Sequence, residues 1–143
     1  MNVCVTIIDG PLPAPAPWSP DGAGAVLCFD GVVRPTENDA PILALDYEVY
    51  HPMAEQQLQQ LAHAMVEQHH LTALCVEHSR GRVRVGECSF RLRIASPHRK
   101  EGLAAMDTFI DRMKRDVPIW KTPVLVESNT PQPTARDPGD TPT

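Results

Sequence analysis

The feature that most constrains the fold is a pair of stretches whose apolar residues recur at helical spacing. The first stretch predicts a helix over about residues 52–69, with an apolar stripe formed by Leu58, Leu61 and Met65. The second predicts a helix over about residues 97–116, with an apolar seam formed by Leu103, Met106, Ile110, Met113 and Val117. Pro118 ends the second helix, because proline has no amide hydrogen to donate and its ring clashes with the preceding turn.

The segments outside these helices alternate apolar and polar residues, which is typical of strands with one buried face. Strands are predicted over residues 3–7, 23–34, 42–50, 72–78 and 88–95. The turn between the last two strands is expected in the region that Gly81 and Gly86 bracket. Short connections of this kind favour an α+β fold, in which two main helices pack on a mostly antiparallel sheet.

The chain of 143 residues is long enough for one domain with a real core. A single catalytic domain is expected over residues 1–127. The proline-rich stretch over residues 128–143 has too few apolar residues to order itself, and a flexible tail is expected there. Five prolines also lie within residues 11–20, where they predict an extended surface loop between two strands.

No apolar run is long enough to span a bilayer, and the first residues lack the basic segment of a signal peptide. These features favour a cytoplasmic protein without a membrane partner. In a reducing compartment, isolated cysteines are most often small buried side chains. We expect this of Cys4, Cys28, Cys75 and Cys88.

The net charge of −5 is distributed unevenly along the chain. Residues 1–79 carry ten acids and one base, whereas residues 80–121 carry eleven of the thirteen bases against five acids. A basic block within an acidic chain indicates a local anion site. A nucleic-acid module would need aromatic residues among the bases and a basic face overall, so it is disfavoured. The six histidines show no metal-ligand spacing, and no metal is expected.

The segment Ser96-Pro97-His98-Arg99-Lys100 lies where a predicted strand ends and the second helix begins. Free backbone N–H groups at a helix start favour an anion, Arg99 can bind a phosphate through two hydrogen bonds, and His98 can donate another. Taken alone, the segment is explained more simply by a solvated helix start with basic side chains at the surface.

Lys114 and Lys121 lie on either side of Pro118. Because Pro118 turns the chain and Trp120 anchors the segment after the turn, Lys121 can return beside Lys114. An amine held near other cations loses part of its proton affinity and can then act as a nucleophile or a general base. The simpler alternative is two solvated lysines at a helix C-terminus, where positive charge is favourable.

Four segments succeed one another in the chain: Phe29-Asp30-Gly31-Val32-Val33-Arg34, the stretch from Leu45 to Glu55, Ser96-Pro97-His98-Arg99, and the stretch from Lys114 to Lys121. They match the patterns F-x-G-x-V-R, L-x-Y-E-x-Y-x-x-M-A-E, S-x-H-R and K-x-x-x-P-x-W-K. In this order the four segments resemble the landmarks of the molybdopterin synthase large (catalytic) subunit family. The resemblance covers about residues 3–123.

This resemblance implies an activity and an assembly. Subunits of that family are sulfur-transfer enzymes that convert a cyclic pyranopterin monophosphate to molybdopterin. The sulfur arrives as a thiocarboxylate on the C-terminus of a small ubiquitin-like partner, and two large subunits form the centre of a heterotetramer. Because the sulfur is carried in, the reaction needs no cysteine nucleophile, and no cofactor is expected.

The resemblance also implies a role for particular residues of this chain. By position, Lys114 and Lys121 are the catalytic lysines and also contact the substrate. The remaining substrate contacts that the resemblance implies are Val32, Val33, Arg34, His98, Arg99, Thr122 and Pro123.

Three stretches depart from the family's pattern. His78-Ser79-Arg80-Gly81 stands where His-Arg, an apolar residue and Gly are common, Pro35 comes after Arg34 without the usual glycine, and Thr122 replaces an acid after Lys121. An alternative therefore stays open, in which the chain is a non-catalytic paralogue that binds the partner or an anionic metabolite without turnover.

Overall fold

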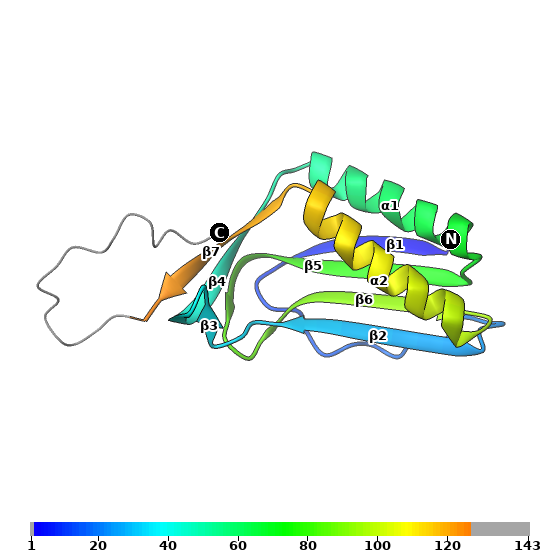
Figure 1. Cartoon of the computed structure of the whole chain (residues 1–143), viewed down its shortest axis with the longest axis horizontal. Coiled ribbons are helices and arrows are strands. Elements are labelled where there is room, and N and C mark those ends of the chain that lie inside the picture. Colours follow the sequence, from blue (N-terminus) through cyan, green and yellow to red (C-terminus); the bar gives the residue numbers. More distant parts are fainter. Residues whose placement is uncertain (1, 127–143) are drawn as a thin grey trace, which may run out of the picture.

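The computed structural model describes residues 2–126, and in it two helices lie on a seven-stranded, mostly antiparallel sheet (Figure 1). The strands are β1 (Val3–Asp9), β2 (Ala25–Val32), β3 (Thr36–Glu37), β4 (Ala40–Val49), β5 (Ala73–Arg84), β6 (Cys88–Ser96) and β7 (Ile119–Leu125). The helices are α1 (Met53–His69) and α2 (Arg99–Asp116). The predicted α+β fold class is confirmed. The predicted tail over residues 128–143 lies outside the described residues.

The sheet has two parts that share β5. In the first part the order is β2-β6-β5-β1, and β1 is parallel to β5 (Figure 1). Beyond Gly81, β5 leaves β6 and pairs with β4, which also pairs with β7 and β3. The prediction that the turn begins at Gly81 is therefore wrong, because the strand β5 continues to Arg84. Gly81 has a φ of 88°, which lets the chain change direction within the strand at little steric cost.

The core lies between the helices and the first part of the sheet. Helix α1 buries the expected stripe, and α2 buries Gly102, Ala105, Phe109 and Met113. The expected place of Leu103 in the seam is wrong, because this side chain is 52% exposed. Gly102, not Leu103, faces the sheet at the start of α2. A Cβ at Gly102 would lie 2.7 Å from the Ser96 hydroxyl oxygen, so glycine lets the start of the helix lie close to β6.

Two cysteines are bonded rather than being isolated buried side chains. Cys4 and Cys75 lie opposite each other on the neighbouring strands β1 and β5, with Cα atoms 4.6 Å apart, and form a disulfide. Cys28 is exposed and Cys88 is half-buried. The expectation of four small buried thiols is therefore wrong, because the pairing of β1 with β5 joins positions 71 residues apart in sequence.

The proline-rich loop between β1 and β2 lies across the face of β6 that points away from the core. Arg91 donates to the carbonyl oxygen of Pro13 over 2.7 Å, and Arg93 donates to that of Ala16 over 2.8 Å. The Arg93 guanidinium also lies 5.4 Å from the centre of the Trp18 ring, within cation–π range. None of the helices in residues 2–126 has the length and apolar content needed to cross a membrane.

Candidate active site

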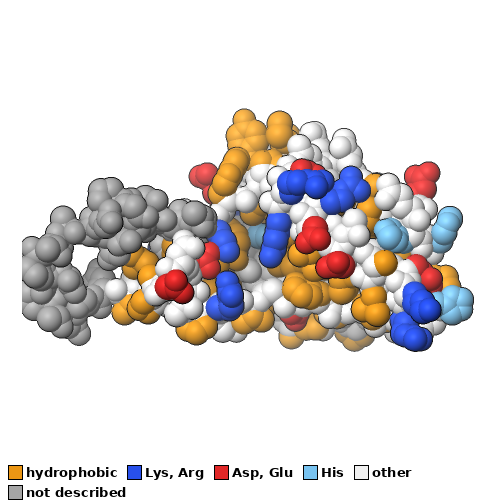
Figure 2. All heavy atoms as spheres, viewed as in Figure 1, with side chains coloured by type: hydrophobic (Ala, Val, Ile, Leu, Met, Phe, Trp, Pro, Cys, Tyr) orange, Lys and Arg blue, Asp and Glu red, His pale blue; other side chains and the backbone are white. Residues whose placement is uncertain are grey.

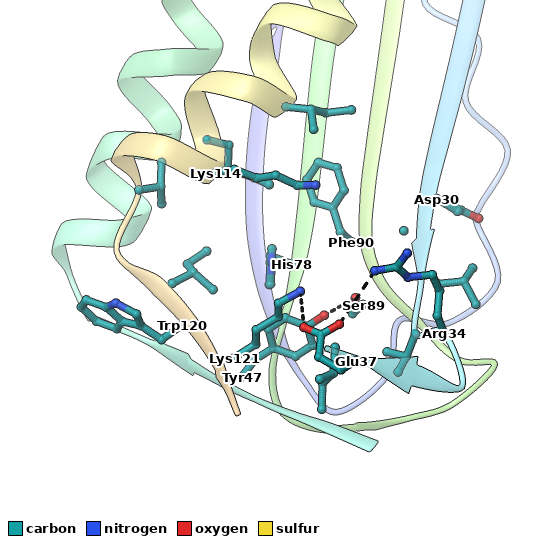
Figure 3. Close-up of a pocket in the computed structure, with 18 of the residues that line it drawn as sticks. Asp30, Arg34, Glu37, Tyr47, His78, Ser89, Phe90, Lys114, Trp120 and Lys121 are labelled. Atoms are coloured by element: carbon teal, nitrogen blue, oxygen red, sulfur yellow. Dashed lines mark hydrogen bonds and ion pairs between the residues drawn. The ribbon is translucent and has the colours of Figure 1, made fainter. Parts of the chain in front are cut away.

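A pocket of about 690 Å³ opens where the C-terminal end of α2 meets the end of β2 and the strands β4 and β7. Its volume is in the range of small-molecule sites. The residues at the end of β2 that line it include Val32, Val33 and Arg34. Figure 3 shows side chains from several elements directed into this one space.

Lys114 and Lys121 both line this pocket, although they belong to different elements (Figure 3). Lys114 lies in the last turn of α2, which ends before Pro118. The chain then enters β7, where Lys121 lies opposite Tyr47 of β4. The antiparallel pairing of β7 with β4 thus returns the second amine to the space that the first one faces.

Glu37 forms an ion pair at the base of this pocket. Its carboxylate lies 2.8 Å from the Lys121 amine and 3.8 Å from the Arg34 guanidinium, and its side chain is only 8% exposed. Asn38 and Asp39 have φ values of 52° and 64° and make the two-residue turn between β3 and β4. No sequence pattern predicted Glu37; its position three residues after Arg34 and before an Asn-Asp turn was the available signal.

A group of neutral polar side chains lines the same pocket. The Tyr47 hydroxyl and the Ser89 hydroxyl are 2.9 Å apart and hydrogen-bonded. Burial raises the pKa of the Tyr47 phenol above its ordinary value, so it stays protonated at neutral pH. Burial lowers the pKa of His78, which is therefore neutral at pH 7. These residues were not predicted as site residues, since they lie on strands far apart in sequence.

His98 and Arg99 lie at the opposite end of α2 from Lys114. Arg99 and Lys114 are fifteen positions apart in the helix, which places them about 22 Å apart along its axis. His98 caps the helix together with Glu101, and its side chain is 84% exposed. Figure 2 shows the basic and His side chains at the start of α2 lying apart from the basic side chains near its other end.

The two remaining predicted contacts lie on β7 after Lys121. Thr122 is exposed and Pro123 is buried opposite Leu45. Among the described residues, neither of them lines the pocket, and the same holds for His98 and Arg99. Only part of the predicted site therefore comes together within one chain. The end of β2 and the two lysines line the pocket, whereas His98, Arg99, Thr122 and Pro123 do not.

The pocket combines cationic and neutral groups in a way that suits a compact anion. Arg34, Lys114 and Lys121 supply positive charge. Two carboxylates also lie in the lining: Glu37 is paired with Lys121, and Asp30 is paired with Arg91. Within residues 2–126, no group of three or more His, Cys, Asp or Glu side chains is arranged to hold a metal ion. Fold and pocket together define an α+β protein with a lysine-lined pocket whose positive charge suits a small anion.

Comparison with known proteins gives the family. The family model described as MoaE protein matches residues 14–116, and the chain belongs to this family. It is 39% identical over 98 residues to the molybdopterin synthase catalytic subunit of Staphylococcus carnosus, which covers 68% of this chain and 65% of that protein. The human subunit of the same name is 34% identical over 107 residues, covering 75% of this chain and 57% of that protein. The matches thus span less than two thirds of these relatives.

Solved structures agree with this assignment. Molybdopterin synthase from Staphylococcus aureus superposes with a TM-score of 0.75 at 29% identity, covering 85% of this chain and 91% of that chain. A complex of subunits 1 and 2 of the molybdopterin-converting factor from Helicobacter pylori superposes with a TM-score of 0.68 at 25% identity, covering 85% and 84%.

Proposed function

We propose that this chain is the catalytic subunit of a molybdopterin synthase. It transfers sulfur from the C-terminal thiocarboxylate of a small ubiquitin-like partner to a cyclic pyranopterin monophosphate. The observation that carries the proposal is the presence of Lys114 and Lys121 in one pocket of a MoaE family member. No cysteine lines the described part of this pocket, which suits a reaction whose sulfur is delivered by the partner.

The surroundings of the two lysines support different roles for them. Lys121 is paired with Glu37, whereas no carboxylate of the described residues lies within ion-pair distance of Lys114. An amine without a competing partner is available to the reacting atoms. We therefore assign the bond-making step with the thiocarboxylate or the pterin to Lys114, and the orientation of the intermediate to Lys121.

The position of His98 and Arg99 supports a role across a subunit interface. Within one chain they are too far from the pocket to contact a ligand bound beside Lys114. Among the described strands, β2 pairs with β6 alone, so its other edge is open. The Ala25 end of β2 lies beside Ser96, next to the start of α2, and its Val32 end lies at the pocket.

An antiparallel pairing of β2 between two copies would bring each helix start to the other copy's pocket. The open strand carries exposed apolar side chains suited to an interface: Val26, Phe29 and Val32 are 48%, 40% and 51% exposed. In the proposed homodimer, His98 and Arg99 of one copy bind the phosphate of the ligand in the other copy's pocket. The small partner then binds to each catalytic subunit, and a heterotetramer results.

Reconstitution tests the activity. The purified chain, a thiocarboxylated small subunit and the cyclic pyranopterin monophosphate are expected to yield molybdopterin. Binding of the small subunit without product would instead indicate a non-catalytic paralogue, and the proposed activity would be rejected.

Mixed dimers test the shared site. Arg99→Ala and Lys114→Ala chains are each expected to be inactive alone. In a mixed dimer, one pocket combines the intact Lys114 of the first chain with the intact Arg99 of the second, so activity is expected to return. If Arg99 acts within its own chain, mixing the two variants restores nothing.

We place this reaction in the cytoplasm. Disulfides are rare in cytosolic proteins, because thioredoxin and glutathione keep thiols reduced. Thiol labelling after rapid acid quenching of cells would measure how much of the Cys4–Cys75 pair is bonded there.

A further inference from the structure

His78 is a buried titratable residue that the lysine chemistry does not use. It lies on β5, lines the pocket, and is only 5% exposed. Figure 3 shows its ring between the region of Lys114 and that of Lys121 and Tyr47. A buried histidine is usually a core residue whose two ring nitrogens both have partners.

The hydrogen bonding of this ring is incomplete. Nδ1 lies 2.8 Å from the carbonyl oxygen of Ser79. A carbonyl oxygen only accepts, so Nδ1 carries the hydrogen and Nε2 of the neutral ring presents a lone pair. Nε2 has no hydrogen-bond partner among the described residues.

The ring is held in place on two sides. The Tyr47 ring meets it edge-on, with centroids 5.1 Å apart and planes at 79°, and the Phe90 ring lies 5.9 Å away. The bond from Nδ1 to Ser79 fixes the rotation that these contacts allow. His78 therefore offers an acceptor of defined direction that needs no rearrangement to receive a ligand.

The neighbouring polar groups of the pocket already have partners. The Tyr47 hydroxyl is bonded to Ser89, and the Lys121 amine is paired with Glu37. Among the described residues, none of these groups donates a hydrogen bond to Nε2. Nε2 is not among the unpaired side-chain atoms that are closed off from solvent in residues 2–126, so it is open to the pocket. A donor from a bound ligand can therefore reach it.

We infer that His78 Nε2 accepts a hydrogen bond from an N–H group on the uncharged ring of the substrate, while Arg34 and, from the other copy, His98 and Arg99 bind its phosphate. This inference rests on the proposed function, since a pterin ring carries amine and lactam N–H groups. It makes His78 a specificity-determining residue: ligands with the same anionic group but no ring donor bind less tightly.

Variants of His78 test the inference through KM in the reconstituted reaction. His78→Phe keeps a ring between Tyr47 and Phe90 but removes the acceptor, and a ten- to hundred-fold rise in KM for the cyclic pterin is expected, since an unpaired buried group is left. His78→Gln, whose amide oxygen can take the place of Nε2, is expected to recover most of that loss. His63→Phe on the exposed face of α1 is the matched control and should leave KM unchanged.

Nitrogen NMR of the histidine-labelled wild-type chain gives a reading that needs neither turnover nor a variant. Before ligand is added, the His78 signals should show hydrogen on Nδ1. The cyclic pyranopterin monophosphate should shift Nε2, whereas inorganic phosphate, which has no ring donor, should not.

The outcomes separate this inference from the proposed function. A shift of Nε2 without formation of molybdopterin would retain the role of His78 and reject the proposed activity. Turnover with an unshifted Nε2 and an unchanged KM in His78→Phe would retain the activity and overturn the role of His78.

Discussion

Replacing Glu37 by Gln removes the carboxylate that holds Lys121 while keeping the side-chain shape. The 2.8 Å contact with Lys121 is a hydrogen bond between charged groups, a class that contributes about 1.5–3 kcal/mol. Lys121 is 42% exposed, so water screens the pair and the lower end applies. The contact with Arg34 is 3.8 Å long and Arg34 is 79% exposed, so it adds at most about 0.5 kcal/mol. We expect a loss of about 1–2 kcal/mol in the free energy of unfolding.

Urea unfolding of four proteins measures this contribution. The wild type, Glu37→Gln, Lys121→Gln and the double variant form a cycle that isolates the pair. A coupling energy of about 1–2 kcal/mol is expected, and Glu67→Gln on the exposed face of α1 should change stability by less than about 0.5 kcal/mol. A coupling energy indistinguishable from zero would refute the reasoning.

The same variant has an expected effect on turnover. Without Glu37 the Lys121 side chain loses its only ion pair among the described residues and samples more rotamers. Misplacing a positioned group by about 1 Å can cost about a hundred-fold in rate, so turnover by Glu37→Gln should fall by tenfold or more. Turnover at the wild-type rate would show that Lys121 needs no carboxylate to orient it.

Three further outcomes are expected. Lys114→Ala should abolish turnover and leave the melting temperature unchanged. Lys114→Arg keeps the charge but not a usable amine and should be equally inactive; an active arginine variant would mean that Lys114 acts only through its charge. Reducing the Cys4–Cys75 bond should lower the free energy of unfolding by about 2–4 kcal/mol, measured by urea unfolding with and without reductant, and an unchanged midpoint would contradict this. Burial lowers the pKa of His78 in the folded state, so below about pH 6.5 the unfolded chain binds more protons than the folded chain. The free energy of unfolding should therefore decrease as the pH is lowered, by up to about 1.4 kcal/mol per pH unit. His78→Phe should lose this component, and equal pH slopes in both proteins would contradict it.

Much of the fold was predictable because it is encoded locally. Helical spacing depends on residues three and four apart, so both helices and the end of α2 before Pro118 could be predicted. Leu103 was misplaced because the sequence does not reveal how closely α2 approaches the sheet. That distance depends on Gly102 lying against Ser96 of another element.

In the candidate site, too, some features follow from the sequence and others only from the tertiary structure. The sequence alone determined which residues carry the family's motifs, and among these Arg34, Lys114 and Lys121 were predicted as site residues. Tertiary structure alone decided that Glu37 pairs with Lys121 and that His78 faces the pocket, because each depends on the register of strands far apart in the chain. Tertiary structure also separated His98 and Arg99 from the lysines, because a straight helix holds its two ends a fixed distance apart.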